Sequence, residues 1–193
     1  MTGFTITEFA GKLANSGLAS PNKFKVQFDG IPGGNSNRQL DFMCEQVDIA
    51  GRSVQSMMNL EYGIRREVAY NAPAYNPLNL TFLCTGNFAE KRILDQWNNL
   101  IVDSINGFDV AYYDTYAKNC TLTVTSLKPD GKTKAFSIIY REVYPKSVSS
   151  IQLNHSTQNT TLRVTSEIQY AFFETDDIRP SSSQPVFTSP SGP

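Results

Sequence analysis

The sequence contains few of the residues on which catalytic chemistry most often depends. Its 193 residues include one histidine, His155, and three cysteines. His155 lies in a polar run, and no Gly-x-Ser-x-Gly motif accompanies it, so the sequence does not indicate a nucleophile paired with a histidine base. The cysteines and the histidine are too far apart in the chain for the usual spacing of a zinc site. The sequence therefore predicts no enzyme, no metal ligand and no cofactor.

Features that bind phosphates or nucleic acids are equally scarce. Gly33 and Gly34 lack the following lysine and Ser or Thr of a phosphate-binding loop. The chain has 17 Lys and Arg against 18 Asp and Glu, so its overall field attracts neither nucleic acid nor an acidic membrane. A general DNA-binding protein is therefore disfavoured.

Long apolar runs are also missing. No run approaches the roughly 20 residues that a membrane-spanning helix needs, and the first residues do not resemble a signal peptide. We therefore expect a soluble protein that is made in a cytoplasm and does not insert into a membrane. In that setting Cys44, Cys84 and Cys120, which occupy apolar positions of expected strands, should be buried free thiols.

The clearest pattern that is present is an alternation near the end of the chain. It predicts a long strand over residues 162–173, with one face toward a core and the other toward water, as in an antiparallel sheet. A strand ending near Tyr140, a corner at 143–145 and a short strand at 151–153 precede it in an expected meander. The apolar positions are Leu162, Val164, Ile168, Tyr170 and Phe172, and the polar positions are Thr161, Arg163, Thr165, Glu167 and Gln169.

Further alternating runs predict more strands. Residues 24–28 and 40–44 are expected to form a hairpin across a glycine-rich loop, and residues 78–84 form another strand. The turn Pro129-Asp130-Gly131 predicts a hairpin, because Pro presets the first turn angle and Gly accepts the left-handed one.

One helix is predicted over residues 87–106. Asn87 is expected to cap it, with Glu90 three residues further on as the partner in a capping pair. Leu94, Trp97, Ile101 and Ile105 share one face, which should close over one side of the sheet. For Trp97 a core position is favoured over stacking on a ligand.

Residues 48–77 predict an extended arm. Methionine, tyrosine and arginine are concentrated there, a mixture typical of protein interfaces. An ordinary peripheral hairpin that covers the core edge explains the same composition, and the sequence leaves both interpretations open. The candidate contacts to other subunits are Met57, Tyr62, Arg65, Tyr70 and Tyr75.

The organisation that these elements imply is one mainly β domain. A chain of this length can bury roughly 70% of its unfolded surface. We expect an N-terminal arm with a short helix at residues 1–22, an antiparallel β-sandwich or half-barrel with one flanking α-helix at residues 23–175, and a flexible tail at residues 176–193. The tail is rich in Pro and Ser and poor in apolar residues.

The linear order of these elements resembles the tail tube proteins of contractile-tailed, T4-like bacteriophages, from about Phe9 to Glu174. The tail after Glu174 and the long loop from Gly30 to Arg38 depart from that pattern, and nothing is carried over to them. The resemblance rests on the helix ending at Ser16-Gly17, the run from Ala19 to Val26, Phe42-x-Cys44, the long arm, the helix with Asp95-Gln96-Trp97, and the ending from Val143-Tyr144-Pro145 through Ile151-x-Leu153 to Tyr170.

The resemblance implies a β-sandwich of which six copies close into a ring by joining their sheets into one barrel. Rings would stack into a hollow tube inside a contractile sheath, a plan shared by type VI secretion tubes. The implied partners are further copies of the chain, the tail sheath protein, and baseplate and tail terminator proteins. The implied location is the tail of a virion that is assembled in the host cytoplasm.

A conduit for DNA must be wet and must not bind phosphates tightly, because each phosphate neutralised by Lys or Arg adds salt-sensitive affinity. We therefore expect a lumen of short polar side chains, in which acidic groups at least match basic ones and DNA makes only transient, non-specific contacts. Thr165, Glu167 and Gln169 are candidates for this lining. The same residues could instead face the sheath, and the sequence does not decide between the two. The arm is our candidate for the contact between rings.

Other functions fit parts of the same pattern. A tube initiator, a tail terminator, or the tube of a secretion or injection machine has the same class of fold. From a different class, the tyrosines and scattered carboxylates could belong to a sugar-binding or hydrolytic β-sandwich. That reading is disfavoured because glycoside hydrolysis needs a pair of carboxylates, and no partner for any of them is evident.

Overall fold

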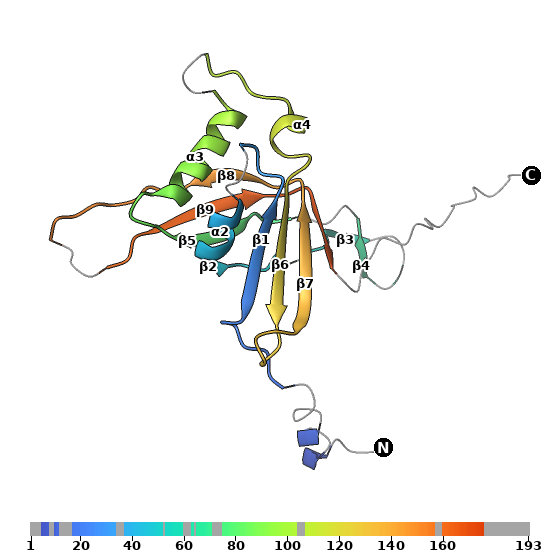
Figure 1. Ribbon diagram of the computed structural model, residues 1–193. Helices are drawn as coiled ribbons and strands as arrows, with labels where there is room; N and C mark the ends of the chain where they lie inside the picture. Colours follow the sequence, from blue (N-terminus) through green and yellow to red (C-terminus); the bar gives the residue numbers. More distant parts are fainter. Residues whose placement is uncertain are drawn as a thin grey trace, which may run out of the picture.

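Two four-stranded antiparallel sheets form the body of the molecule in the computed structural model (Figure 1). Sheet A has the strand order β1-β6-β7-β10, and sheet B has the order β2-β5-β9-β8. The structure describes residues 5–7, 10–11, 17–33, 37–51, 53–59, 63, 65–70, 75–103, 107–156 and 160–175. The elements are β1 (Phe24–Asp29), α2 (Asn37–Met43), β2 (Cys44–Val47), β3 (Ser56–Asn59), β4 (Arg66–Ala69), β5 (Leu78–Leu83), α3 (Ala89–Ile101), α4 (Tyr113–Tyr116), β6 (Thr121–Leu127), β7 (Lys134–Arg141), β8 (Tyr144–Val148), β9 (Arg163–Gln169) and β10 (Phe172–Thr175).

One core is built from alternate side chains of both sheets. Leu80 and Phe82 on β5 are fully buried, as is Leu122 on β6. Phe28 of sheet A meets Phe82 of sheet B with ring centroids 6.3 Å apart. Burial of each such side chain stabilises the fold by about 1.5–3 kcal/mol. The predicted mainly β, antiparallel fold with a flanking helix is confirmed.

The predicted hairpin between residues 24–28 and 40–44 is wrong. Residues 37–43 form helix α2, and the following strand β2 belongs to sheet B, whereas β1 belongs to sheet A. Leu40 is fully buried but Phe42 is 78% exposed, although a strand would place both on one face. An alternation of three apolar residues is too short to separate a strand from a helical turn.

The last third of the chain crosses between the sheets instead of forming a meander. β7 and β10 lie in sheet A, whereas β8 and β9 lie in sheet B, and residues 151–153 form no strand. The predicted strand 162–173 is therefore two strands. The chain changes sheets around Tyr170, so Phe173 packs against the core and Phe172 is 41% exposed. Tyr170 and Ala171 belong to neither strand, and the break there shifts the alternation by one residue, which turns each following side chain to the opposite face.

Helix α3 is shorter than predicted and begins differently. It runs from Ala89 to Ile101, and its N-cap is Phe88, whose φ of 53° is left-handed. The predicted cap at Asn87 is therefore wrong by one residue. Glu90 accepts its hydrogen bonds from the amide and hydroxyl of Thr85, which lies two residues before Asn87. The predicted inner face is confirmed for Leu94, Trp97 and Ile101, which are buried, whereas Ile105 lies outside the described residues. The Trp97 indole N–H donates to the carbonyl of Tyr116 at 3.0 Å.

The predictions for the 129–131 turn, the cysteines and the two ends of the chain can each be compared with the structure. The Pro129-Asp130-Gly131 hairpin is confirmed, since β6 and β7 pair across it and Gly131 has φ of 70°. All three cysteines are free, with Cys120 buried and the other two half-buried. In the described part of the chain, no helix has the length and apolar character needed to cross a bilayer. Phe9 and Leu13 of the predicted N-terminal helix, and residues 176–193, lie outside the described residues.

Candidate functional site

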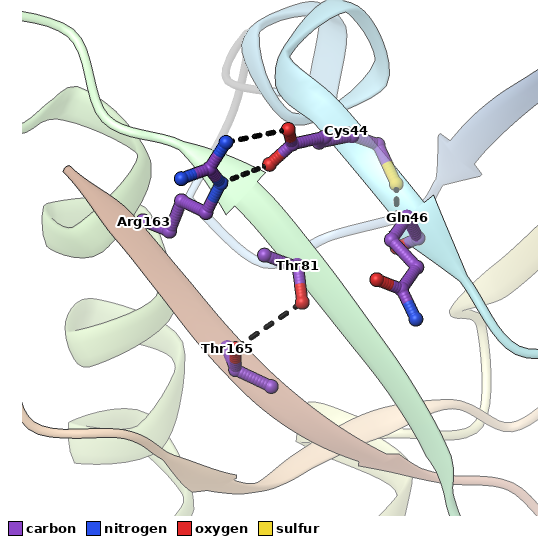
Figure 2. A network of polar contacts seen from close by, with 6 residues as sticks. Cys44, Gln46, Thr81, Arg163 and Thr165 are labelled. Carbon is purple, nitrogen blue, oxygen red and sulfur yellow. Dashed lines mark hydrogen bonds and ion pairs between the residues drawn. The ribbon is translucent and has the colours of Figure 1, made fainter. Parts of the chain in front are cut away.

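The outward side of sheet B carries mostly polar side chains, and we call this surface the polar face. Because side chains alternate along a strand, the residues between the buried ones on β5 and β9 all point away from the core. Figure 2 shows part of this surface, where Thr81 and Thr165 touch across the two central strands with their hydroxyl oxygens 3.2 Å apart. The polar face consists of Glu45, Gln46, Asn79, Thr81, Lys146, Ser147, Arg163, Thr165, Glu167 and Gln169, and the half-buried Leu83 lies beside Arg163 on the same side.

An ion pair on the polar face joins β2 and β9, which are not neighbouring strands. The Arg163 guanidinium on β9 makes two hydrogen bonds to the Glu45 carboxylate on β2, one of them 2.9 Å long from Nη2 to Oε1 (Figure 2). β5 lies between these strands in the sheet. The side-chain hydrogen bond from Arg163 holds the pKa of Glu45 below its usual value, and the pKa of Arg163 is raised in return.

A second ion pair lies near the other edge of the sheet. The Lys146 ammonium on β8 is 3.6 Å from Glu167 Oε1 on β9, and Ser147 donates to Oε2 of the same carboxylate at 3.3 Å. The four strands of sheet B contain two basic residues, Lys146 and Arg163, and two acidic residues, Glu45 and Glu167. The formal charge of this sheet is therefore zero, and each cation has a carboxylate partner.

The three residues predicted for a lumen lie together on this surface. Thr165, Glu167 and Gln169 are half-buried, alternate along β9 and share its outward side. Sequence reasoning missed Glu45, because the segment before it was assigned to a hairpin with β1. It also missed Lys146, because a corner was predicted at 143–145, where strand β8 begins at Tyr144. The spacing of charges along the chain holds no signal for either pair.

The predicted arm contains a hairpin that stands apart from the sandwich. β3 and β4 pair only with each other among the described strands (Figure 1). Met57 is 51% exposed and Tyr70 is 66% exposed, and Arg65 is exposed as well. Among the described residues of this arm, the exposed large apolar side chains are Ile49, Val54, Met57, Met58, Val68 and Tyr70.

The other two arm candidates have different positions. Tyr62 lies outside the described residues. Tyr75 packs against the core, with its ring centroid 5.6 Å from that of Tyr170 and 5.6 Å from that of Phe173. Tyr75 therefore anchors the base of the arm to the sandwich and is not part of its exposed surface.

A second exposed apolar surface escaped sequence reasoning. Val102, after α3, forms a β-bridge with Val110, and Phe108 between them has φ of 62° and is 72% exposed. The spacing of Phe108, Val110 and Tyr112 was the available signal, but such a short run does not show which side faces water.

The described residues hold few groups that point to chemistry on a small molecule. His155 lies exposed in a turn, and within the described ranges no group of three His, Cys, Asp or Glu residues is placed to hold a metal ion. The buried carboxylate of Glu90 is occupied by hydrogen bonds from Gln39 and Thr85. The described residues thus present outward a polar face whose strand charges cancel and an arm with exposed apolar side chains, and exposed apolar patches are typical of protein–protein contact sites.

The sequence comparison identifies the family. The chain belongs to the phage tail tube protein family, whose model matches residues 19–176. It is a structural subunit of a tail tube, and the resemblance drawn from its sequence is confirmed. A comparison with curated proteins finds no match.

Solved structures with the same fold come from contractile injection systems. A chain in the cryo-EM structure of the anti-feeding prophage baseplate has a TM-score of 0.59 at 13% identity, over 83% of this chain and 96% of that chain. A chain in the sheath-tube complex of an extracellular contractile injection system, in its extended state, has a TM-score of 0.57 at 13% identity, over 90% and 98%. A chain in the anti-feeding prophage tube-terminating cap has a TM-score of 0.58 at 10% identity, over 82% and 90%.

Proposed function

We propose that six copies of this chain close into a ring, and that the rings stack into a hollow tube through which DNA passes inside a contractile sheath. The proposal rests on the tail tube family and on the assemblies in which the fold recurs: a baseplate with six-fold symmetry, a sheath-tube complex and a tube-terminating cap. The corresponding partners of this chain are the tail sheath protein and the baseplate and tail terminator proteins. Its place is the tail of a virion assembled in the host cytoplasm, and its role involves no catalysis.

The observation that carries this proposal is the polar face of sheet B. Its edge strands are β2 and β8, and neither has a second neighbour among the described strands. Joining β2 of one copy to β8 of the next would continue the sheet around a ring and leave no exposed edge. The neutral polar face would then line the channel, with Thr165, Glu167 and Gln169 among its residues.

The arm is the proposed contact between rings. Stacking requires a head-to-tail contact between different surfaces of the same chain. Met57, Arg65 and Tyr70 are exposed on a hairpin outside the sandwich, so they can reach a second ring without disturbing the core. Tyr62 is proposed to join them, and Tyr75 supports them from the core side.

Closely related roles use the same fold. A tube terminator is the second candidate, because a chain in the tube-terminating cap has a TM-score of 0.58. A terminator would form rings that do not stack. Negative-stain microscopy of the purified full chain separates the two: long hollow tubes with six-fold end views support the proposal, and single rings support the terminator. A monodisperse monomer at high concentration would overturn both.

Thiol labelling of assembled tubes tests which surface lines the channel. A Thr165→Cys variant should react with a small maleimide that enters the tube but not with a maleimide on a large dextran. The matched variant Gln27→Cys, exposed on the outward side of sheet A, should react with both. Burial raises the pKa of Cys44 to about 12 and of Cys120 to about 11, and it raises the pKa of Cys84 as well. Wild-type tubes labelled in parallel give the background from these three native thiols. The opposite labelling pattern would place sheet A at the channel.

A further inference from the structure

We propose that Glu45 masks Arg163, and that this masking keeps the channel from binding DNA tightly. The inference rests on the proposed function, in which the polar face lines the channel. The polar face includes Arg163, whose positive charge would by itself attract the phosphates of DNA. In the structure, however, the arginine is engaged by a carboxylate on the same surface.

The geometry of the Glu45–Arg163 pair allows the carboxylate to block the guanidinium from binding phosphate. A guanidinium binds a phosphate through the same planar pair of N–H groups with which it binds a carboxylate. Here two nitrogens of Arg163, Nε and Nη2, donate to the two oxygens of Glu45. A phosphate must therefore displace Glu45 to use that edge of the guanidinium, and the carboxylate charge repels the phosphate as it approaches.

The placement of the pair is not a by-product of local sequence. Lys118–Asp114 and Lys91–Asp95 are pairs four residues apart in the sequence, a common arrangement on helix surfaces. Glu45 and Arg163 are separated by 118 positions and meet only because β2 and β9 flank β5. Lys146 and Glu167 form a second ion pair between strands on the same face, with a longer N–O distance of 3.6 Å.

The consequence of unmasking follows from counterion release. Each phosphate that a cation neutralises makes the slope of log affinity against log salt steeper by about 0.9. A ring repeats every residue in each copy, so a single substitution frees one guanidinium per subunit around the channel. Glu45→Gln keeps the size of the side chain and removes only its charge.

The test measures binding of a short fluorescent DNA duplex to open-ended tubes over a series of KCl concentrations. Glu45→Gln should bind DNA at least about tenfold more tightly than wild type at low salt, with a salt slope steeper by at least about 0.9. The matched control is Asp114→Asn, which makes the same change in net charge and frees Lys118, a residue that belongs to no strand of sheet B. It should bind DNA like wild type, and so should the double variant Glu45→Gln with Arg163→Gln.

Failure of the masking proposal and failure of the channel assignment give different results. If Thr165→Cys labels only with the small maleimide and Glu45→Gln tubes bind DNA like wild type, the masking proposal is overturned and the tube proposal stands. If the large maleimide also labels Thr165→Cys, the channel assignment itself fails. Should Glu45→Gln form no tubes, Glu167→Gln, which frees Lys146, provides the same measurement, and unchanged DNA binding by its tubes would overturn the proposal.

Discussion

Gly30 occupies a point where two chain segments approach too closely for any side chain. Its φ is 79°, and a Cβ at this position would lie 2.2 Å from the carbonyl oxygen of Asn119. The Gly30 carbonyl also accepts a hydrogen bond from Cys120 Sγ at 3.1 Å. We expect Gly30→Ala to lower the free energy of unfolding by more than about 3 kcal/mol, because the clash adds to the cost of the left-handed backbone. Urea unfolding measures the loss.

Gly131 provides the control for that substitution. It is also left-handed, with φ of 70°, but no atom lies within 4 Å of an added Cβ. Gly131→Ala should therefore cost only about 1–2 kcal/mol, the penalty of the backbone conformation alone. Equal losses in the two variants would contradict the clash at Gly30.

Glu90 is a fully buried carboxylate that ties three segments together. Gln39 on α2 donates to Oε1 at 2.8 Å, and the amide and hydroxyl of Thr85 donate to Oε2 at 2.9 and 3.0 Å. Burial would raise the pKa of this carboxyl, but the hydrogen bonds outweigh it and the pKa of Glu90 is lowered. Its contribution to stability is therefore present above the unfolded pKa of about 4.3 and is lost as the pH falls through the folded pKa.

Glu90→Gln should lower the free energy of unfolding by about 2 kcal/mol at neutral pH, because one charged acceptor is replaced by a neutral amide. The difference from wild type should shrink as the pH falls below about 4. Urea titrations at several pH values measure both effects. Glu174→Gln breaks a partly exposed pair with Arg141, so this control should change stability by less than about 1 kcal/mol. A constant difference between Glu90→Gln and wild type at every pH would refute the pKa argument.

At the scale of elements, the β3–β4 hairpin within the arm forms a sheet separate from the two sheets of the sandwich. Because β3 and β4 pair only with each other among the described strands, removal of residues 55–69 should change the free energy of unfolding by less than about 1 kcal/mol. The same deletion should abolish tube formation, because it removes Met57 and the strands that carry it. Thermal melting and negative-stain microscopy check the two halves of this prediction.

The control for the deletion removes exposed apolar surface elsewhere. Leu153 is 74% exposed and lies outside the arm. Leu153→Ser should leave both the fold and the tubes intact. Tubes that persist after deletion of the arm would show that stacking uses another surface, of which the one around Phe108 and Val110 is the next to test.

At the scale of the whole molecule, assembly should stabilise the folded chain. A tube binds only the native subunit, so mass action raises the free energy of unfolding by up to about 1.4 kcal/mol for each tenfold increase in protein concentration. The melting temperature should rise with it. Scanning calorimetry over a roughly hundredfold concentration range should show this rise for the wild-type chain. The arm-deleted variant should melt at one temperature throughout. A wild-type midpoint that does not move would argue against self-assembly under these conditions.

Much of the local structure could be predicted where a pattern is long enough to have one meaning. The alternation around Leu80 and around Val164 identifies β5 and β9, and the common face of Leu94 and Trp97 identifies α3. Shorter patterns failed. Leu40 and Phe42 suggest a strand but lie on a helix, because two apolar residues two positions apart fit both structures.

The candidate site was predicted only in part for a related reason. The outward direction of Thr165, Glu167 and Gln169 follows from alternation along one strand, which is a local property of the chain. Their neighbours do not follow from it. Arg163 meets Glu45 only because β2 and β9 lie on either side of β5, and strand order depends on contacts between distant parts of the chain.

By itself, the sequence determined the antiparallel β character, the buried face of α3, the near-neutral charge and the order of elements that resembles tail tube proteins. These properties depend on residue type and short-range periodicity. The tertiary structure decided how the strands divide between two sheets, that Phe173 and not Phe172 turns to the core, and that each cation of sheet B has a carboxylate partner. The physical reason is that packing and ion pairing join residues far apart in the chain, and no local pattern records which of them meet.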